Sequence, residues 1–101
     1  MAKAYLKLLR EAAARDLHMI VRCPEEGDIL GHGKYKAAKD AVESVEMAAV
    51  EMVDLYSGKP AAVFVIIPGY AADGEDIVDY GGWKAEALMN AINEEGNYAK
   101  A

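Results

Sequence analysis

Seven consecutive apolar residues, Ala61–Ile67 (AAVFVII), stand between two prolines and are rich in β-branched side chains. A run of this kind is typical of a β-strand covered on both faces, because a half-buried strand would alternate apolar with polar residues. It is far shorter than the roughly 18 apolar residues of a membrane-spanning helix. The sequence therefore predicts a central, buried strand. Val63, Val65 and Ile67 are expected on one face of it, and Phe64 and Ile66 on the other.

Helical periodicity is clearest over residues 34–56, where apolar side chains recur on one face and acidic side chains on the opposite face. The pattern predicts a long amphipathic helix that ends before Gly58 and Pro60, two residues typical of helix ends. Its charges oppose the helix macrodipole, because lysines come first while Glu51 and Asp54 stand near the end. Shorter amphipathic helices are predicted over residues 3–15 and from residue 83 to about residue 95, before Gly96.

Three shorter segments complete the expected sheet. Over Leu17–Cys23, the apolar residues Leu17, Met19 and Val21 alternate with His18, Ile20 and Arg22, which is typical of a half-buried strand. The turn PEEG connects this strand to Asp28–Leu30 in a predicted hairpin. Ile77 and Val78 are expected to form a further short strand. The predicted fold is a single small α/β (α+β) domain over residues 1–101, in the order α-ββ-α-ββ-α, with the long central helix packed on a small sheet.

The sequence also contains a possible internal duplication. The segment Asp28–Ala37 resembles Asp76–Ala85, and each follows a predicted strand that ends in proline. If the duplication is real, the acidic turns that precede the two segments lie at related edges of one sheet. Chance similarity explains the match equally well.

The charge of the chain restricts its partners. The formal net charge is −6, with 8 basic and 5 acidic side chains in residues 1–39 but 3 basic and 12 acidic ones in residues 40–101. This balance argues against direct binding to nucleic acid or to an anionic membrane, and it allows a basic partner. The charged N-terminal segment does not have the apolar core of a signal peptide, and Cys23 has no second cysteine to pair with. A cytoplasmic protein is therefore expected.

The acidic face of the long helix is the preferred recognition surface. By helical projection, two apolar residues stand within a rim of carboxylates, as in a small protein contact. We expect a non-enzymatic module that binds, and could inhibit, a basic nucleic-acid-handling protein, by analogy of size and charge with small acidic accessory proteins of phages. A solvated acidic surface is the simpler alternative, and a homodimer is also compatible with the pattern. The expected contact residues are Glu43, Glu46, Met47, Val50, Glu51, Asp54, Asp73, Glu75 and Asp76.

The alternative function is a small enzyme or a binding domain for an anionic small molecule. A glycine-containing turn before a helix can seat an anion on free backbone N–H groups, and the long loop Pro68–Gly82 would complete the pocket with Asp76 and Asp79. Neither phosphate-binding glycine motif, GxxxxGK[ST] or GxGxxG, is present. The expected anion-binding residues are Gly31, His32, Gly33 and Lys34.

No metal or other cofactor is predicted. The soft ligand candidates are Cys23, His18 and His32, with Asp28 as a fourth, and they lack the paired spacings of zinc sites. The acidic segment DGEDIVDYGGWK lacks the glycine and glutamate positions of a calcium-binding EF-hand loop. Spacing along the chain does not decide whether Cys23, His18 and His32 meet in space.

Overall fold

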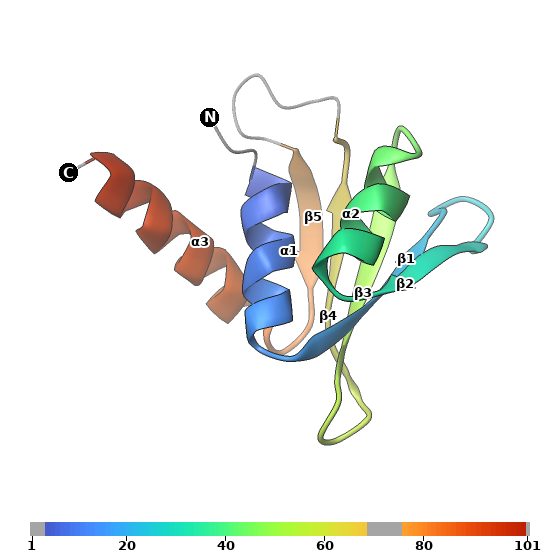
Figure 1. Cartoon of the computed structure of the whole chain (residues 1–101), viewed down its shortest axis with the longest axis horizontal. Helices are drawn as coiled ribbons and strands as arrows, with labels where there is room; N and C mark the ends of the chain where they lie inside the picture. The colour runs from blue at the N-terminus through green and yellow to red at the C-terminus, as the bar shows by residue number, and fades with distance from the viewer. Residues whose placement is uncertain (1–3, 69–75, 101) are drawn as a thin grey trace.

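The structure, a computed structural model, describes residues 4–68 and 76–100, with side chains described up to residue 92. It confirms a small α+β domain, in which the described residues form three helices and five strands (Figure 1). The elements are α1 (Ala4–Ala14), β1 (Leu17–Arg22), β2 (Ile29–Gly33), α2 (Tyr35–Glu43), β3 (Ala48–Asp54), β4 (Pro60–Ile66), β5 (Ile77–Gly81) and α3 (Ala85–Lys100).

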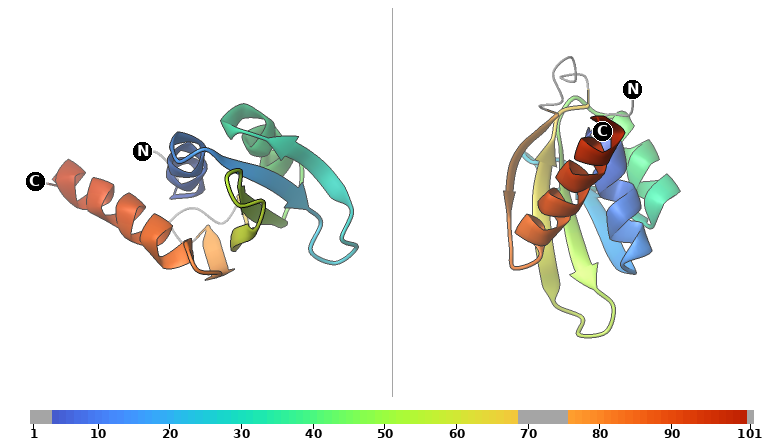
Figure 2. Two further views of the ribbon diagram at one scale, coloured as in Figure 1. Left: turned by 90° about the horizontal axis from the view of Figure 1, so that it is seen from below. Right: turned by 90° about the vertical axis from the view of Figure 1, so that its left-hand side faces the viewer.

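The strands form one antiparallel sheet in the order β2-β1-β3-β4-β5. Helices α1 and α2 lie side by side on one face of it, and α3 packs against α1 and β4 (Figures 1 and 2). The core lies between this face and the helices, where Leu8 of α1, Val42 of α2 and Leu88 of α3 are fully buried. The opposite face, which we call the open face, is not covered by any element that the structure describes.

The helix predicted over residues 34–56 is confirmed only for its first part, and the prediction is wrong after Glu43. Helix α2 ends at Glu43, Ser44 caps it by donating a hydrogen bond to the carbonyl of Ala41, and residues 48–54 form the middle strand of the sheet. Ala48 and Met52 fit the helical and the strand periods equally, so the apolar pattern did not distinguish the two structures. Pairing with β1 on one side and β4 on the other stabilises the strand, so tertiary context overrides the helical periodicity.

The element order is therefore α-ββ-α-βββ-α, with one strand more than predicted. The end of the last helix also differs, because α3 continues through Gly96 to residue 100. The two segments of the suggested duplication form the two edge strands, β2 and β5, and each is followed by a helix. The element before β1 is a helix whereas the element before β4 is a strand, so the duplication stays a hypothesis.

Strand β4 is covered on one face only. Phe64 and Ile66 are fully buried beneath the helices, as predicted, but Val63 on the open face is 40% exposed and Val65 and Ile67 are half-buried. The expectation that both faces are covered is therefore wrong for this chain. Among the described helices, none is long and apolar enough to cross a bilayer.

Candidate functional site

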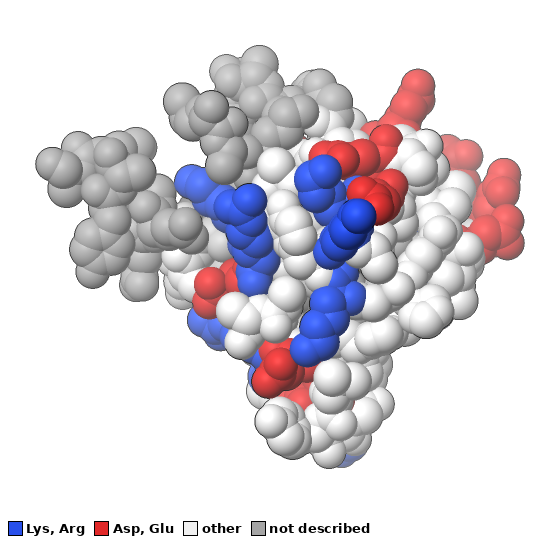
Figure 3. Space-filling model, viewed as in Figure 1, with Lys and Arg blue, Asp and Glu red and all other residues white. Residues whose placement is uncertain are grey.

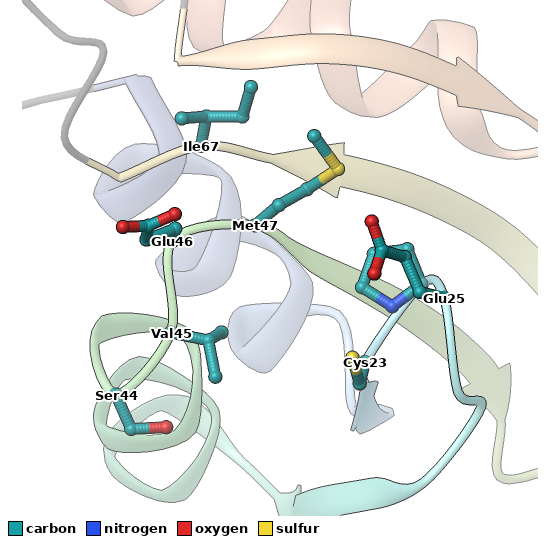
Figure 4. A pocket seen from close by; sticks show the side chains of 8 residues that line it. Cys23, Glu25, Ser44, Val45, Glu46, Met47 and Ile67 are labelled. Carbon is teal, nitrogen blue, oxygen red and sulfur yellow. The ribbon is translucent and has the colours of Figure 1, made fainter.

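An open cleft lies at one end of the sheet, where β1 and β4 end and β3 begins (Figure 4). Its volume is about 570 Å³, which is within the range of small ligand pockets. We call it the acidic cleft. It is lined by Cys23, Pro24, Glu25, Ser44, Val45, Glu46, Met47 and Ile67.

Two local structures shape the acidic cleft. In the β1–β2 turn, the Cys23 N–H donates to the Asp28 carbonyl at 2.9 Å and the Gly27 N–H donates to the Cys23 carbonyl at 2.7 Å. Gly27 has a φ of 76°, which glycine adopts without the cost that a side chain would add. On the other side, the end of α2 at Ser44 directs the following residues across the end of the sheet. The turn and the α2–β3 connection thus face each other across the cleft.

The cleft combines an apolar wall with carboxylates. In Figure 4 the Met47 side chain lies between Glu46 and Glu25, and Val45 and Ile67 add apolar surface. Met47 is 42% exposed, and both glutamates are exposed. A long side chain with an aliphatic stem and a terminal cation matches such a surface, because its stem can cover apolar groups while its charge meets carboxylates.

The predicted contact residues do not form one surface. Glu46 and Met47 do lie together in the acidic cleft, but Val50 is fully buried under the helices and cannot contact a partner. The expectation for Val50 is therefore wrong, because residues 48–54 alternate as a strand and place Val50 in the core. Glu51 lies on the open face, where its carboxylate is 3.9 Å from the Arg22 guanidinium.

Asp54 and Glu43 are engaged within the chain. The pKa of the Asp54 carboxyl is lowered, chiefly because the Tyr56 backbone N–H donates to it and also because Lys84 lies 3.4 Å away. Glu43 accepts hydrogen bonds from Tyr5 at 2.6 Å and Lys39 at 3.0 Å. Asp54 lies at the other end of β3 from the acidic cleft, so the carboxylate rim expected from Glu43, Glu46, Glu51 and Asp54 is not formed.

The second acidic segment divides into two parts. Asp73 and Glu75 lie outside the described residues. Asp76 is fully buried, and its Oδ2 accepts the backbone N–H of Tyr5 at 2.7 Å, so it caps the first turn of α1 from a distant part of the chain. Its Oδ1 has no hydrogen-bond partner among the described residues. Asp76 thus fixes α1 to the start of β5, and its burial keeps it from contact with a partner.

The hydroxyl of Tyr5 makes the stability of the folded protein depend on pH in the alkaline range. The pKa of its hydroxyl is raised, first because burial removes it from water and second because it donates to Glu43. The folded state therefore retains the proton when an unfolded tyrosine, with a pKa of about 10, loses it. This contribution to stability is complete below about pH 10 and is lost as the pH rises further.

We expect Tyr5→Phe to lower the free energy of unfolding by about 1–2 kcal/mol at neutral pH, because a hydrogen bond to a carboxylate is lost. Above about pH 10, the stability of the variant should fall less steeply than that of the parent. Urea unfolding at a series of pH values measures both effects. Tyr56→Phe is the matched control, because Tyr56 is 89% exposed. A parallel pH dependence in parent and Tyr5→Phe would contradict the assignment.

The glycines of the alternative site are explained by packing. Gly31 and Gly33 belong to β2, not to a loop, and an added Cβ would lie 3.0 Å from the Cβ atoms of Ala41 and Ala37 respectively. They are needed because α2 lies close against β2. The ammonium of Lys34 pairs with Asp16 at 3.1 Å. Within the second predicted loop, Pro68 is buried, residues 69–75 lie outside the described part, and Asp79 is exposed on β5.

The soft ligand candidates separate into two groups. His18 and His32 lie on neighbouring strands with ring centroids 5.3 Å apart, whereas Cys23 and Asp28 belong to the turn at the far end of the hairpin. Within the part of the chain that the structure describes, no group of three or more histidine, cysteine or acidic side chains is arranged to hold a metal ion.

A second exposed surface, not expected from the sequence, lies at the end of the sheet opposite the acidic cleft. Leu55 and Tyr56 in the β3–β4 turn are 55% and 89% exposed, and Trp83 is 66% exposed. The Trp83 indole N–H donates to the Pro60 carbonyl at 3.1 Å, and Lys84 lies over its ring at 4.8 Å. The sequence does carry a signal for this surface. Leu55 and Tyr56 are large apolar side chains in a hairpin turn, where polar residues are usual.

No protein family, no curated protein and no solved structure matches this chain.

Proposed function

We propose that this chain is a non-enzymatic protein-interaction module that binds a basic partner through the acidic cleft. The observation that carries the proposal is the placement of Glu25 and Glu46 around the apolar Met47 in one open cleft. The occupant that fits is a lysine or arginine side chain of the partner. Its stem would pack on Met47 and Ile67, and its cation would meet the carboxylates that flank Met47.

The distribution of charge over the molecule supports this choice. Figure 3 shows lysine and arginine side chains over α1 and α2, and acidic side chains toward the end that carries the β1–β2 turn. Glu25, Glu26 and Asp28 are exposed in that turn, beside the cleft. Such a field would attract a basic surface and orient it toward the cleft.

Each exposed ion pair contributes only about 0.2–1 kcal/mol, so charge alone does not give tight binding. The apolar contact with Met47 is therefore needed for a long-lived complex, while the carboxylates speed association. A nucleic-acid-handling protein is the class of partner that we propose, because its phosphate-binding lysines and arginines have the required chemistry. Occupying those side chains would inhibit nucleic-acid binding by that partner.

The proposal is tested with short oligolysine and oligoarginine peptides, with oligoglutamate as the negative probe. Association and dissociation rates are measured at low and moderate salt. We expect Glu46→Lys to slow association of the basic peptides by about three- to tenfold, because it reverses one charge of the cleft. Met47→Asp should instead speed dissociation, because a carboxylate would be desolvated at the apolar wall.

Glu86→Lys is the matched control. It makes the same change of charge on the exposed surface of α3, away from the acidic cleft. We expect it to bind the basic peptides as the parent does. If Glu46→Lys and Glu86→Lys weaken binding equally, only the net charge matters and the cleft is not the site. If all variants bind alike, the proposed surface is wrong.

A further inference from the structure

The two histidines of this chain lie next to each other in the folded protein. His18 is on β1 and His32 on β2, and the antiparallel register pairs His32 with Ile20, one position along the same face from His18. Both side chains are on the open face, since the alternate residues Met19 and Val21 are buried under the helices. The ring centroids are 5.3 Å apart.

We propose that His18 and His32 together bind one Zn²⁺ ion. Imidazole nitrogen lies about 2.0–2.1 Å from Zn²⁺, which places each ring centroid about 3.2 Å from the ion. Two imidazoles at a tetrahedral angle then have centroids about 5.2 Å apart, whereas the right angle of an octahedral site would bring them to about 4.5 Å. The observed separation of 5.3 Å is close to the tetrahedral value.

The surroundings allow an ion to enter and stay. His32 is exposed and His18 is half-buried, so both rings are reachable from solvent. Both are carried by paired strands rather than by a loop, since His18 pairs with Val53 of β3 and His32 with Ile20 of β1, so the backbone holds them at a fixed separation. Asp16, two residues before His18, has its carboxylate paired with the Lys34 ammonium. The protein therefore supplies two nitrogen ligands, and the other two positions are open to water or to a ligand from another molecule.

An open site of this kind differs from a structural zinc site. It does not hold the fold together, and its affinity comes from two imidazoles acting on one ion. Once one imidazole has bound the Zn²⁺ ion, binding by the other imidazole is intramolecular and therefore favourable. The loss of either ring should therefore remove most of the Zn²⁺ affinity. The site is separate from the acidic cleft, and its test does not depend on the proposed partner.

The test is a titration of the whole chain with ZnCl₂ at neutral to slightly alkaline pH, followed by calorimetry and by NMR of the imidazole signals. We expect both imidazoles to respond with the same midpoint, because one ion contacts both rings. MgCl₂ should give no response, because Mg²⁺ prefers oxygen ligands. His18→Gln and His32→Gln should each weaken Zn²⁺ binding by at least about tenfold.

Cys23→Ser is the control, because the thiol is the other soft ligand among the described residues and lies at the far end of the hairpin. We expect it to bind Zn²⁺ with the parent's affinity. Circular dichroism confirms that each variant is folded, and the shared NMR midpoint in the parent is a readout that needs no variant. Separate midpoints for the two imidazoles, or full binding by either glutamine variant, would overturn the proposal. A loss of binding in Cys23→Ser would overturn it as well.

Discussion

Phe64→Ala is expected to lower the free energy of unfolding by about 3–5 kcal/mol, because it removes a large side chain from a fully buried position. Phe64 lies on the helix-covered face of β4, paired with Val50 of β3 and Tyr80 of β5. Its ring stacks against that of Tyr80 with centroids 5.9 Å apart. Small domains have a total stability of about 5–15 kcal/mol, so the variant should be partly unfolded at physiological temperature. Urea unfolding monitored by circular dichroism measures the loss.

Val63→Ala is the control for this experiment. Val63 precedes Phe64 on the same strand but lies on the open face, where it is 40% exposed. Its truncation should cost less than about 1 kcal/mol, because little buried surface is lost. Equal losses in the two variants would show that both faces of β4 are covered, contrary to the structure.

The first hairpin and the first helix could be predicted from the sequence. In β1, the buried residues Leu17, Met19 and Val21 alternate with half-buried ones, and one face of a helix could not present all three. In α1, Tyr5 and Leu9 recur at the helical spacing and are buried. In both segments the local pattern and the tertiary structure agree.

The segment after α2 could not be predicted from periodicity, because its alanines and Met52 suit a helix and a strand alike. One signal against a helix was nevertheless present. Glu51 and Asp54 would have stood near the negative end of the helix dipole, which is unfavourable. In the strand they instead face Arg22 and Lys84, and the conflict disappears.

The acidic cleft was half predictable. Glu46 and Met47 are neighbours in sequence, so any local structure would have kept them close. Glu25 and Ile67 come from elements that are distant in the chain, and they reach the same cleft because β1 and β4 both pair with β3 and end beside its start. The proximity of the two histidines likewise depends on the strand register, which spacing along the chain does not reveal.

Gly82→Ala is the second change for which we expect a large effect, a loss of about 2–5 kcal/mol. Gly82 connects β5 to α3 with a φ of 108°, a conformation that costs about 1–2 kcal/mol for a residue with a side chain. An added Cβ would also lie 2.7 Å from the Ala61 carbonyl oxygen and from the Ala62 Cα. Those atoms are backbone of β4 and cannot move aside as a side chain can, so steric repulsion adds about 1–3 kcal/mol.

Gly58→Ala separates the two causes of this loss. Gly58 has a similar positive φ of 70°, but an added Cβ there would meet no atom within 4 Å. Its substitution should therefore cost only the free energy of the unfavourable backbone conformation, about 1–2 kcal/mol.

The clash in Gly82→Ala should also disturb the start of α3. The Ala61 carbonyl that this substitution would displace accepts the Lys84 N–H at 3.0 Å. Hydrogen exchange of the α3 amides should accelerate in Gly82→Ala and remain unchanged in Gly58→Ala. Equal losses of stability with unchanged exchange would mean that α3 does not pack closely against β4 at this point.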